Sequence, residues 1–266
     1  MSGRPLLGHL WRRHAHALAA LAAGSFLFQW VFTRAAPAPS RAEALRGILA
    51  FVPPAVMDVF GSDLTAALSP RGFLALGWAH PFALLMMAVW VVRVGAASLA
   101  GEIGRGTMDL VASRPVRRAS VVAWSLAAAL GGLALIVAAG WTGTAVGLAT
   151  RPLEGAAPGQ LIGPAILAWL LFAAFGCMTL LLSALRRHGG EAISLASGIM
   201  AVSFALDYLG RAWRPIAWAR PYSLFAHYEP RRLVSGAIAG GDAAVLGLVA
   251  LVCAALAFAA FHRRDL

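Results

Sequence analysis

The chain alternates between long apolar runs and short polar segments. Six runs are long enough to cross a bilayer, for which about 20 apolar residues are needed. They cover residues 17–33, 73–97, 121–148, 161–185, 192–209 and 243–261. Because lipid offers the backbone no hydrogen-bond partners, each run is predicted to be a helix. The pattern therefore predicts an all-α integral membrane protein with six transmembrane helices in a single domain, residues 1–266.

Two of the segments outside these runs have patterns of their own. Residues 1–16 place apolar side chains at helical spacing with arginines off that face, which predicts a separate interfacial helix before the first span. A plain basic flank is the alternative. The segment between the last two runs, residues 210–242, is rich in proline and aromatic residues. It predicts short helices at the outer membrane interface, a place that suits Trp and Tyr.

The second run carries three residues that an ordinary span does not need. His80-Pro81 lies near its outer end, where the proline is expected to kink the helix. Arg93 lies near its inner end. A charge inside a span is costly and marks a functional candidate. We expect Arg93 to extend toward the inner interface or to pair with Glu102.

The third run contains Gly143 and Gly147, four residues apart. Small residues at this spacing let two helices approach closely. The same spacing also arises by chance in a chain rich in alanine and glycine, so the pattern alone predicts only where a close contact could form.

Composition supports the membrane assignment. Hydrophobic residues make up 60% of the chain and charged residues 12%, whereas soluble domains have about 25% charged residues. The net charge is +11, and every basic residue is arginine. Because these arginines flank the runs, they indicate contact with anionic lipid rather than nucleic acid. They are denser in the segments that share a side with the N-terminus, which predicts that both termini are cytoplasmic.

The chain lacks the residues of the common catalytic sites. A nucleotide-binding P-loop requires lysine, and the sequence has none. It also lacks metalloprotease and serine-hydrolase motifs. Cys177 and Cys253 fall inside predicted spans and are expected to pack there, and interfacial hydrogen bonding is expected for Asp207, His227 and Glu229. The chain is therefore predicted not to be an enzyme and to hold no cofactor; any ATP it uses must bind another polypeptide.

A compact polar block, LAGEIGRGTMDLVASRPVRR, separates the second and third runs at residues 99–118. Thr107 is suited to cap a new helix, and Asp109 would lie in its first turn, near the positive end of the helix dipole. Pro115 would end it. The block predicts a short helix across the cytoplasmic mouth of the bundle; a tight turn with ordinary flanking charges is the alternative.

This block resembles the cytoplasmic loop of ABC-2-type transporter permeases, whose pattern is roughly A-G-E-x-x-x-G-T-[LM]-[DE]-L-L-L-[AS]-x-P-V-x-R. Further segments are similar to the family at corresponding places. They are His80-Pro81, PYSLFAHYEP at residues 221–230 and the closing FHRRDL at residues 261–266. The chain departs from the pattern at Arg93 and at Val111-Ala112, where leucines are usual.

The resemblance implies the permease subunit of an ATP-driven exporter in a bacterial or archaeal cell membrane. Such a subunit pairs with an identical or paralogous copy and docks two cytoplasmic ATPase subunits, which bind ATP and magnesium. The block would be the coupling helix that inserts into the ATPase, with Glu102 as an acidic hinge. The coupling role would extend to Gly106, Thr107, Met108, Asp109, Leu110, Ser113, Arg114, Pro115 and Arg117. The alternatives, an ion-coupled secondary transporter and a non-transporting membrane scaffold, need no ATPase.

Overall fold

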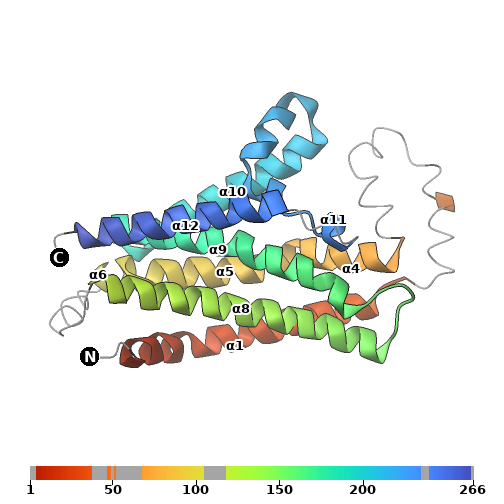
Figure 1. The fold of residues 1–266 in the computed structure, drawn as a ribbon, viewed down its shortest axis with the longest axis horizontal. Coiled ribbons are helices and arrows are strands. Elements are labelled where there is room, and N and C mark those ends of the chain that lie inside the picture. The colour runs from red at the N-terminus through yellow and green to blue at the C-terminus, as the bar shows by residue number, and fades with distance from the viewer. Residues whose placement is uncertain are drawn as a thin grey trace.

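The computed structural model describes residues 4–37, 47–48, 51, 68–104, 118–234 and 240–264, apart from the side chains of residues 4–11. The regular structure in these residues is helical, with no strand, as predicted (Figure 1). The longer helices are α1 (Arg4–Arg34), α4 (Pro70–Ala79), α5 (Pro81–Ser98), α8 (Arg118–Thr150), α9 (Ile162–Leu185), α10 (Gly189–Ala212) and α12 (Gly240–His262). The shorter ones are α6 (Ala100–Gly104), α11 (Pro230–Val234) and the 3-10 segments η1 (Pro158–Leu161), η2 (Arg214–Tyr222) and η3 (Leu224–His227).

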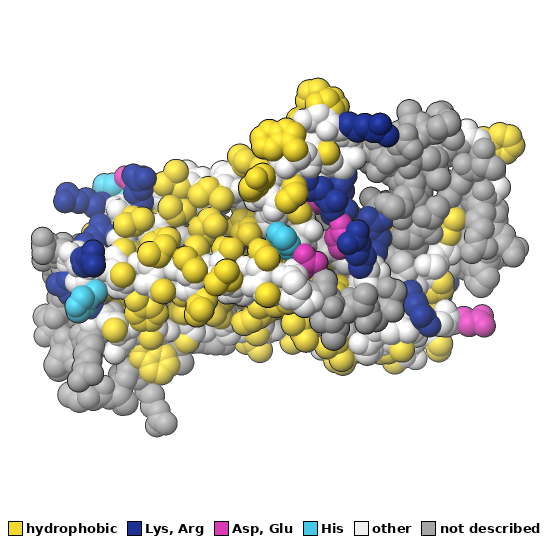
Figure 2. Space-filling view, turned by 45° about the horizontal axis from the view of Figure 1, so that its top comes forward, with side chains coloured by type: hydrophobic (Ala, Val, Ile, Leu, Met, Phe, Trp, Pro, Cys, Tyr) yellow, Lys and Arg dark blue, Asp and Glu magenta, His cyan; other side chains and the backbone are white. Residues whose placement is uncertain are grey.

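Six helical stretches are long and apolar enough to cross a membrane. They are Arg12–Arg34, Pro70–Ser98, Arg118–Thr150, Pro158–Leu185, Gly189–Ala212 and Gly240–His262. Each contains one predicted run, so six candidate spans are confirmed. In the last, Asp242 and His262 are separated by about 30 Å of helix, which matches the hydrocarbon core of a bilayer. Figure 2 shows a face of the bundle covered by hydrophobic side chains, with one group of charged side chains at its left end and another right of its centre.

The predicted interfacial helix is not a separate element. α1 runs without interruption from Arg4 to Arg34, so the residues before the first span continue its helix. The physical reason lies in the sequence: after Pro5, at the second position of the helix, no further proline breaks the pattern. A helix can therefore propagate through Gly8 and the two arginines that follow, at a small cost from the glycine.

The second span is broken at His80, as the proline predicted. Pro81 has no N–H for the helical ladder and disfavours helical geometry in the residue before it. His80 accordingly takes an extended conformation (φ −64°, ψ 133°) and ends α4. Its Nδ1 accepts a hydrogen bond from the Phe82 N–H at 3.2 Å. His80 thus caps α5, and the break divides one span into two helices.

α9 lies at the centre of the bundle, packed against α5, α8, α10 and α12. Along the middle of α9, residues 171–177 are all buried. By contrast, α10 and α12 keep most of their apolar surface outside the fold, including Ile199, Leu248 and Leu251. These two helices therefore present their apolar sides to lipid or to another membrane protein.

Glycines on α8 allow α1 to pack closely against it. A Cβ on Gly143 would stand 2.2 Å from the carbonyl oxygen of Phe26, and one on Gly147 would stand 2.7 Å from Cβ of Thr33. Neither position has room for a side chain. The close contact that the spacing allowed is therefore present, and its partner is α1.

Both described chain ends lie at the same end of the bundle, which we call the terminal end (Figure 1). Arg118, at the start of α8, donates to the carbonyl of His262 at 3.4 Å. Arg264 donates to the carbonyl of Ala184 at 2.7 Å. Burial and the nearby charge of Arg187 lower the pKa of Arg264. These bonds tie the end of α12 to α8 and α9.

Toward the opposite end, which we call the distal end, the last part of α10 and η2 form a hairpin that extends sideways from the bundle beside the start of α12, light blue in Figure 1. Its aromatic side chains are exposed: Trp213, Trp218 and Tyr222. Short helices between the fifth and sixth spans were predicted, and η2, η3 and α11 confirm them.

Candidate functional site

α6 continues the second span past a bend and leads into the polar block. Leu99, which joins α5 to α6, has φ −117°, far from the value of about −63° in a regular helix. The Ala100 N–H donates to the hydroxyl of Ser183 at 2.8 Å. That hydroxyl in turn donates to the carbonyl of Ala96 at 3.2 Å. One buried serine on α9 thus satisfies two backbone groups that the bend leaves without helical partners.

The opposite side of α6 contacts the turn between α9 and α10. A Cβ on Gly189 would lie 3.3 Å from Cα of Gly101, and one on Gly104 would lie 3.2 Å from the carbonyl oxygen of Arg187. The backbones touch here because side chains are absent. α6 and the start of α10 are therefore packed backbone to backbone.

Glu102 on α6 forms an ion pair with Arg13 on α1. The pair joins the first span to the segment that leads into the polar block. Glu102 does not pair with Arg93, which was one of the two expectations for that arginine. Arg93 is exposed on α5 and lines the groove described below. Sequence reasoning missed Arg13 as the partner, because no local spacing connects two residues on different spans.

The other predicted coupling residues fall in residues 105–117, outside the described part of the chain. They are Gly106, Thr107, Met108, Asp109, Leu110, Ser113, Arg114, Pro115 and Arg117. The structure describes the two helices that flank this block. α6 precedes it and α8 follows it, and both lie at the terminal end where they adjoin it.

An open apolar groove of about 960 Å³ runs between α5 and α10. Its walls include residues at both ends of α5, from Pro81 to Ala97, and continue to Gly101 and Gly104 on α6. The start of α10 and the turn residue His188 close the terminal end. A groove of this size is within the range that holds a small organic ligand. Its terminal end is built by α6, the helix that leads into the polar block.

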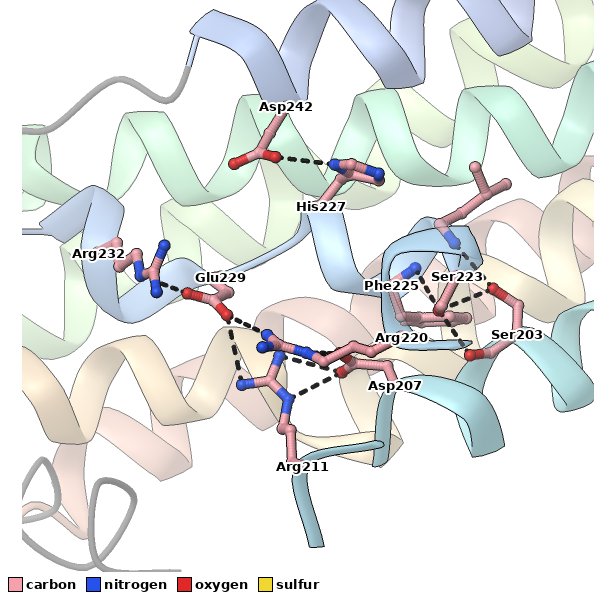
Figure 3. A network of polar contacts seen from close by, with 11 residues as sticks. Ser203, Asp207, Arg211, Arg220, Ser223, Phe225, His227, Glu229, Arg232 and Asp242 are labelled. Carbon is pink, nitrogen blue, oxygen red and sulfur yellow. Dashed lines mark hydrogen bonds and ion pairs between the residues drawn. The ribbon is translucent and has the colours of Figure 1, made fainter. Parts of the chain in front are cut away.

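The distal end carries a network of two carboxylates and three arginines (Figure 3). Asp207 accepts from Nε of Arg211 at 3.1 Å and from Nε of Arg220 at 2.9 Å. Glu229 pairs with both of these arginines and with Arg232. The network connects α10, η2 and α11, and it holds the base of the lateral hairpin.

Hydrogen bonds beside this network hold the segment that follows the hairpin. The Ser223 hydroxyl donates to the carbonyl of Ser203 at 2.6 Å, and the Leu224 N–H donates to the Ser203 hydroxyl at 3.0 Å. Tyr228 donates to the carbonyl of Trp78 at 3.0 Å. Burial raises the pKa of Tyr228 above its usual range, so the phenol stays protonated and keeps donating.

His227 lies 2.8 Å from Asp242 and connects η3 with α12 (Figure 3). Together with the pairs of Asp207 and Glu229, this contact confirms that the three residues form hydrogen bonds and ion pairs. The sequence indicated polar contacts at these positions. It did not indicate that arginines would be most of the partners.

Comparison with known proteins identifies the family. Residues 62–266, which hold five of the six candidate spans, match the family described as ABC-2 family transporter protein. No curated protein matches the chain. Permeases of this family are typically non-catalytic membrane subunits. The chain therefore belongs to the ABC-2 family of transporter proteins.

Proposed function

We propose that this protein is the permease subunit of an ATP-driven exporter, and that it converts ATP hydrolysis in a separate ATPase subunit into movement of its helices. One observation carries the proposal: α6, which leads into the block that resembles a coupling helix, also builds the terminal end of the apolar groove. α6 would thus both adjoin the block that docks the ATPase and form part of the wall of the substrate path.

The packing around α6 suggests how force is transmitted. Residues 106–117 would insert into the ATPase, with Met108 and Leu110 supplying apolar contacts and Arg114 and Arg117 charge. Glu102, held by Arg13, would keep α6 aligned with α1. Displacement of α6 would move the start of α10 through the contact between Gly101 and Gly189. Because α10 and α5 form the groove, this movement would change its width.

The groove also supports assembly of two permease copies. Side chains in its walls are exposed in a single chain, including Leu85 and Val89 at 57% and 43%. An open groove cannot shield a polar group of a substrate from lipid, whereas a second copy placed over it would enclose a path. The partner copy would be an identical chain or a paralogue. ATP and magnesium would bind only to the two ATPase subunits.

The proposed orientation places the terminal end in the cytoplasm of a bacterium or archaeon, where the ATPase subunits lie. Arginines are about as numerous on the two sides of the bundle, but on the terminal side they lie in short segments, among them Arg118, Arg186, Arg187 and Arg263. Short segments dominate the positive-inside rule, which favours this orientation. The aromatic hairpin would then lie near the outer interface.

The groove gives no support to an ion-coupled secondary transporter. Such proteins use carboxylates or broken helices near the middle of the membrane to bind the coupling ion. The break at His80 does not lie there, because the 18 residues of α5 separate it from the terminal end by about 27 Å of helix. Among the described residues that line the groove there is no carboxylate. Asp207, the acidic residue near the end of α10, is already paired with two arginines.

Purification of the tagged protein from native membranes in mild detergent, with mass spectrometry of the co-eluting proteins, tests the proposal. We expect a stoichiometric ATPase that carries a P-loop, and we expect Arg117→Glu or Met108→Asp to remove it. Arg214→Glu, a charge reversal at the exposed distal end, serves as the control and should retain it. A homo-oligomer without an ATPase would contradict the proposal and favour the secondary transporter or the scaffold.

A further inference from the structure

Arg93 differs from the other groove residues in both charge and surroundings. It is the charged residue of α5, and its side chain is exposed toward the groove. Within the described part of the chain it forms no hydrogen bond or ion pair. Arg13, the other arginine in the groove wall, is neutralised by Glu102. Among the described residues of this site, Arg93 is therefore a cation without a counter-charge.

Arg93 lies close enough to the terminal end for its side chain to reach water or to meet an anion in the groove. It lies five residues before the end of α5, about 7–8 Å along the helix axis. An arginine at such a depth is stabilised when it reaches water or an anion. No carboxylate among the described groove residues supplies that anion. A ligand that brings its own negative charge would supply it.

The remaining groove wall sets the rest of the ligand's chemistry. From Arg93 toward Pro81 the wall is apolar for about 18 Å of helix, with Val89, Leu85 and Leu84 on α5. Facing them on the same groove are Met200 and Phe204 of α10. In its described part, the groove thus combines the unpaired guanidinium of Arg93 near the terminal end with an apolar wall that leads away from it.

We propose that the groove binds an amphipathic anion with a single apolar chain, with its anionic head on Arg93 and its chain along α5 toward Phe204. This assignment rests on the proposed function, since it names the substrate class of the transport path. Charge complementarity selects the anion. The volume of about 960 Å³ suits one chain better than a phospholipid with two, because cavities of this size hold ligands of drug-like dimensions.

Direct binding tests the proposal without any ATPase. The full-length protein is placed in nanodiscs of zwitterionic lipid and photolabelled with a diazirine analogue of palmitic acid at pH 8. We expect labelled peptides from α5 and α10, and competition by palmitate but not by hexadecanol. Labelling that hexadecanol blocks equally well would overturn the requirement for an anion. Loss of labelling on addition of phosphatidylglycerol would assign the groove to a membrane phospholipid and would also overturn the proposal.

Variants locate the two halves of the ligand. Arg93→Gln should weaken competition by palmitate about tenfold or more, because it removes a hydrogen bond to a charged group, whereas Arg93→Lys should retain most of it. Arg186→Gln is the matched control, since Arg186 is exposed at the same end but outside the groove. Ala201→Trp, which fills the apolar part, should also abolish labelling. Unchanged binding in both Arg93→Gln and Ala201→Trp would overturn the assignment.

The outcome separates this inference from the proposed function. Binding by a protein that co-purifies with no ATPase would support the amphipathic anion and contradict the permease mechanism. If an ATPase co-purifies but the protein does not bind palmitate, the permease mechanism would be supported and the amphipathic anion contradicted.

Discussion

The carboxylate of Glu102 on α6 pairs with the guanidinium of Arg13 on α1, although 89 positions separate them in the chain. The pair connects the first span to the segment that enters the polar block. Both side chains remain partly exposed, at 31% for Arg13 and 19% for Glu102. Exposed ion pairs contribute about 0–1 kcal/mol to stability, so the pair is better suited to aligning α6 than to holding the fold together.

A charge swap tests this alignment. Glu102→Arg should lower the ATPase rate of the reconstituted complex several-fold while shifting the thermal midpoint little. The double variant with Arg13→Glu should restore much of the rate, because the attraction is rebuilt with opposite polarity. Glu191→Arg, which reverses an exposed carboxylate at the same end, should have little effect. Failure of the double variant to recover would argue against an aligning role.

The buried serine that anchors α6 gives a second prediction. Ser183→Ala removes the acceptor of the Ala100 N–H, and an unsatisfied buried donor costs about 1–3 kcal/mol. We expect faster hydrogen exchange in residues 99–104 and a reduced ATPase rate. Ser194→Ala, at an exposed position on α10, is the matched control. Unchanged exchange in residues 99–104 would show that the serine is not what fixes α6.

The contact between α1 and α8 predicts a large difference between two glycine substitutions. Gly143→Ala would drive its Cβ to 2.2 Å from a backbone oxygen of α1, whereas Gly198 on α10 has nothing within 4 Å. Overpacking typically costs about 1–3 kcal/mol. We expect Gly143→Ala to lower the thermal midpoint in detergent by several degrees and Gly198→Ala to leave it unchanged or raise it. Equal midpoints would mean that α1 moves away from α8 freely.

The distal network predicts unequal roles for two arginines that share one carboxylate. Arg220 pairs with both Asp207 and Glu229, whereas Arg232 pairs with Glu229 from a side chain that is 75% exposed. Arg220→Gln should loosen the lateral hairpin and increase proteolytic cleavage between residues 213 and 222. Arg232→Gln should change cleavage little, because exposed pairs contribute little. Similar cleavage in the two variants would contradict this ranking.

The positions of the spans followed from the sequence because lipid imposes a simple constraint. A run of about 20 apolar residues has no stable alternative to a helix in hydrocarbon, so the six runs located the spans to within a few residues. The break at His80 was predictable for a local reason as well, since proline acts on its own helix. The interfacial helix was predicted wrongly, because an amphipathic pattern does not say whether a helix ends before the next one begins.

The candidate site depended on contacts between distant parts of the chain. Arg93 was visible as an unusual charge, but whether it met Glu102, solvent or a groove was decided by how α5 packs against α10. Arg13 and Arg220 gave no local signal of their partners, because ion pairs between spans follow from the arrangement of helices. The glycine spacing on α8 marked a close contact without naming α1 as the other side.

The sequence alone thus determined the class of the protein, the number and limits of its spans and the position of the polar block, since these depend on local composition and on the surrounding lipid. The tertiary structure decided which helices form the groove, that α6 builds its terminal end, and that Arg93 faces it with no carboxylate among the described lining residues. These features arise from helix packing, in which small residues and side-chain shape determine which helices contact one another. No local sequence pattern specifies those contacts.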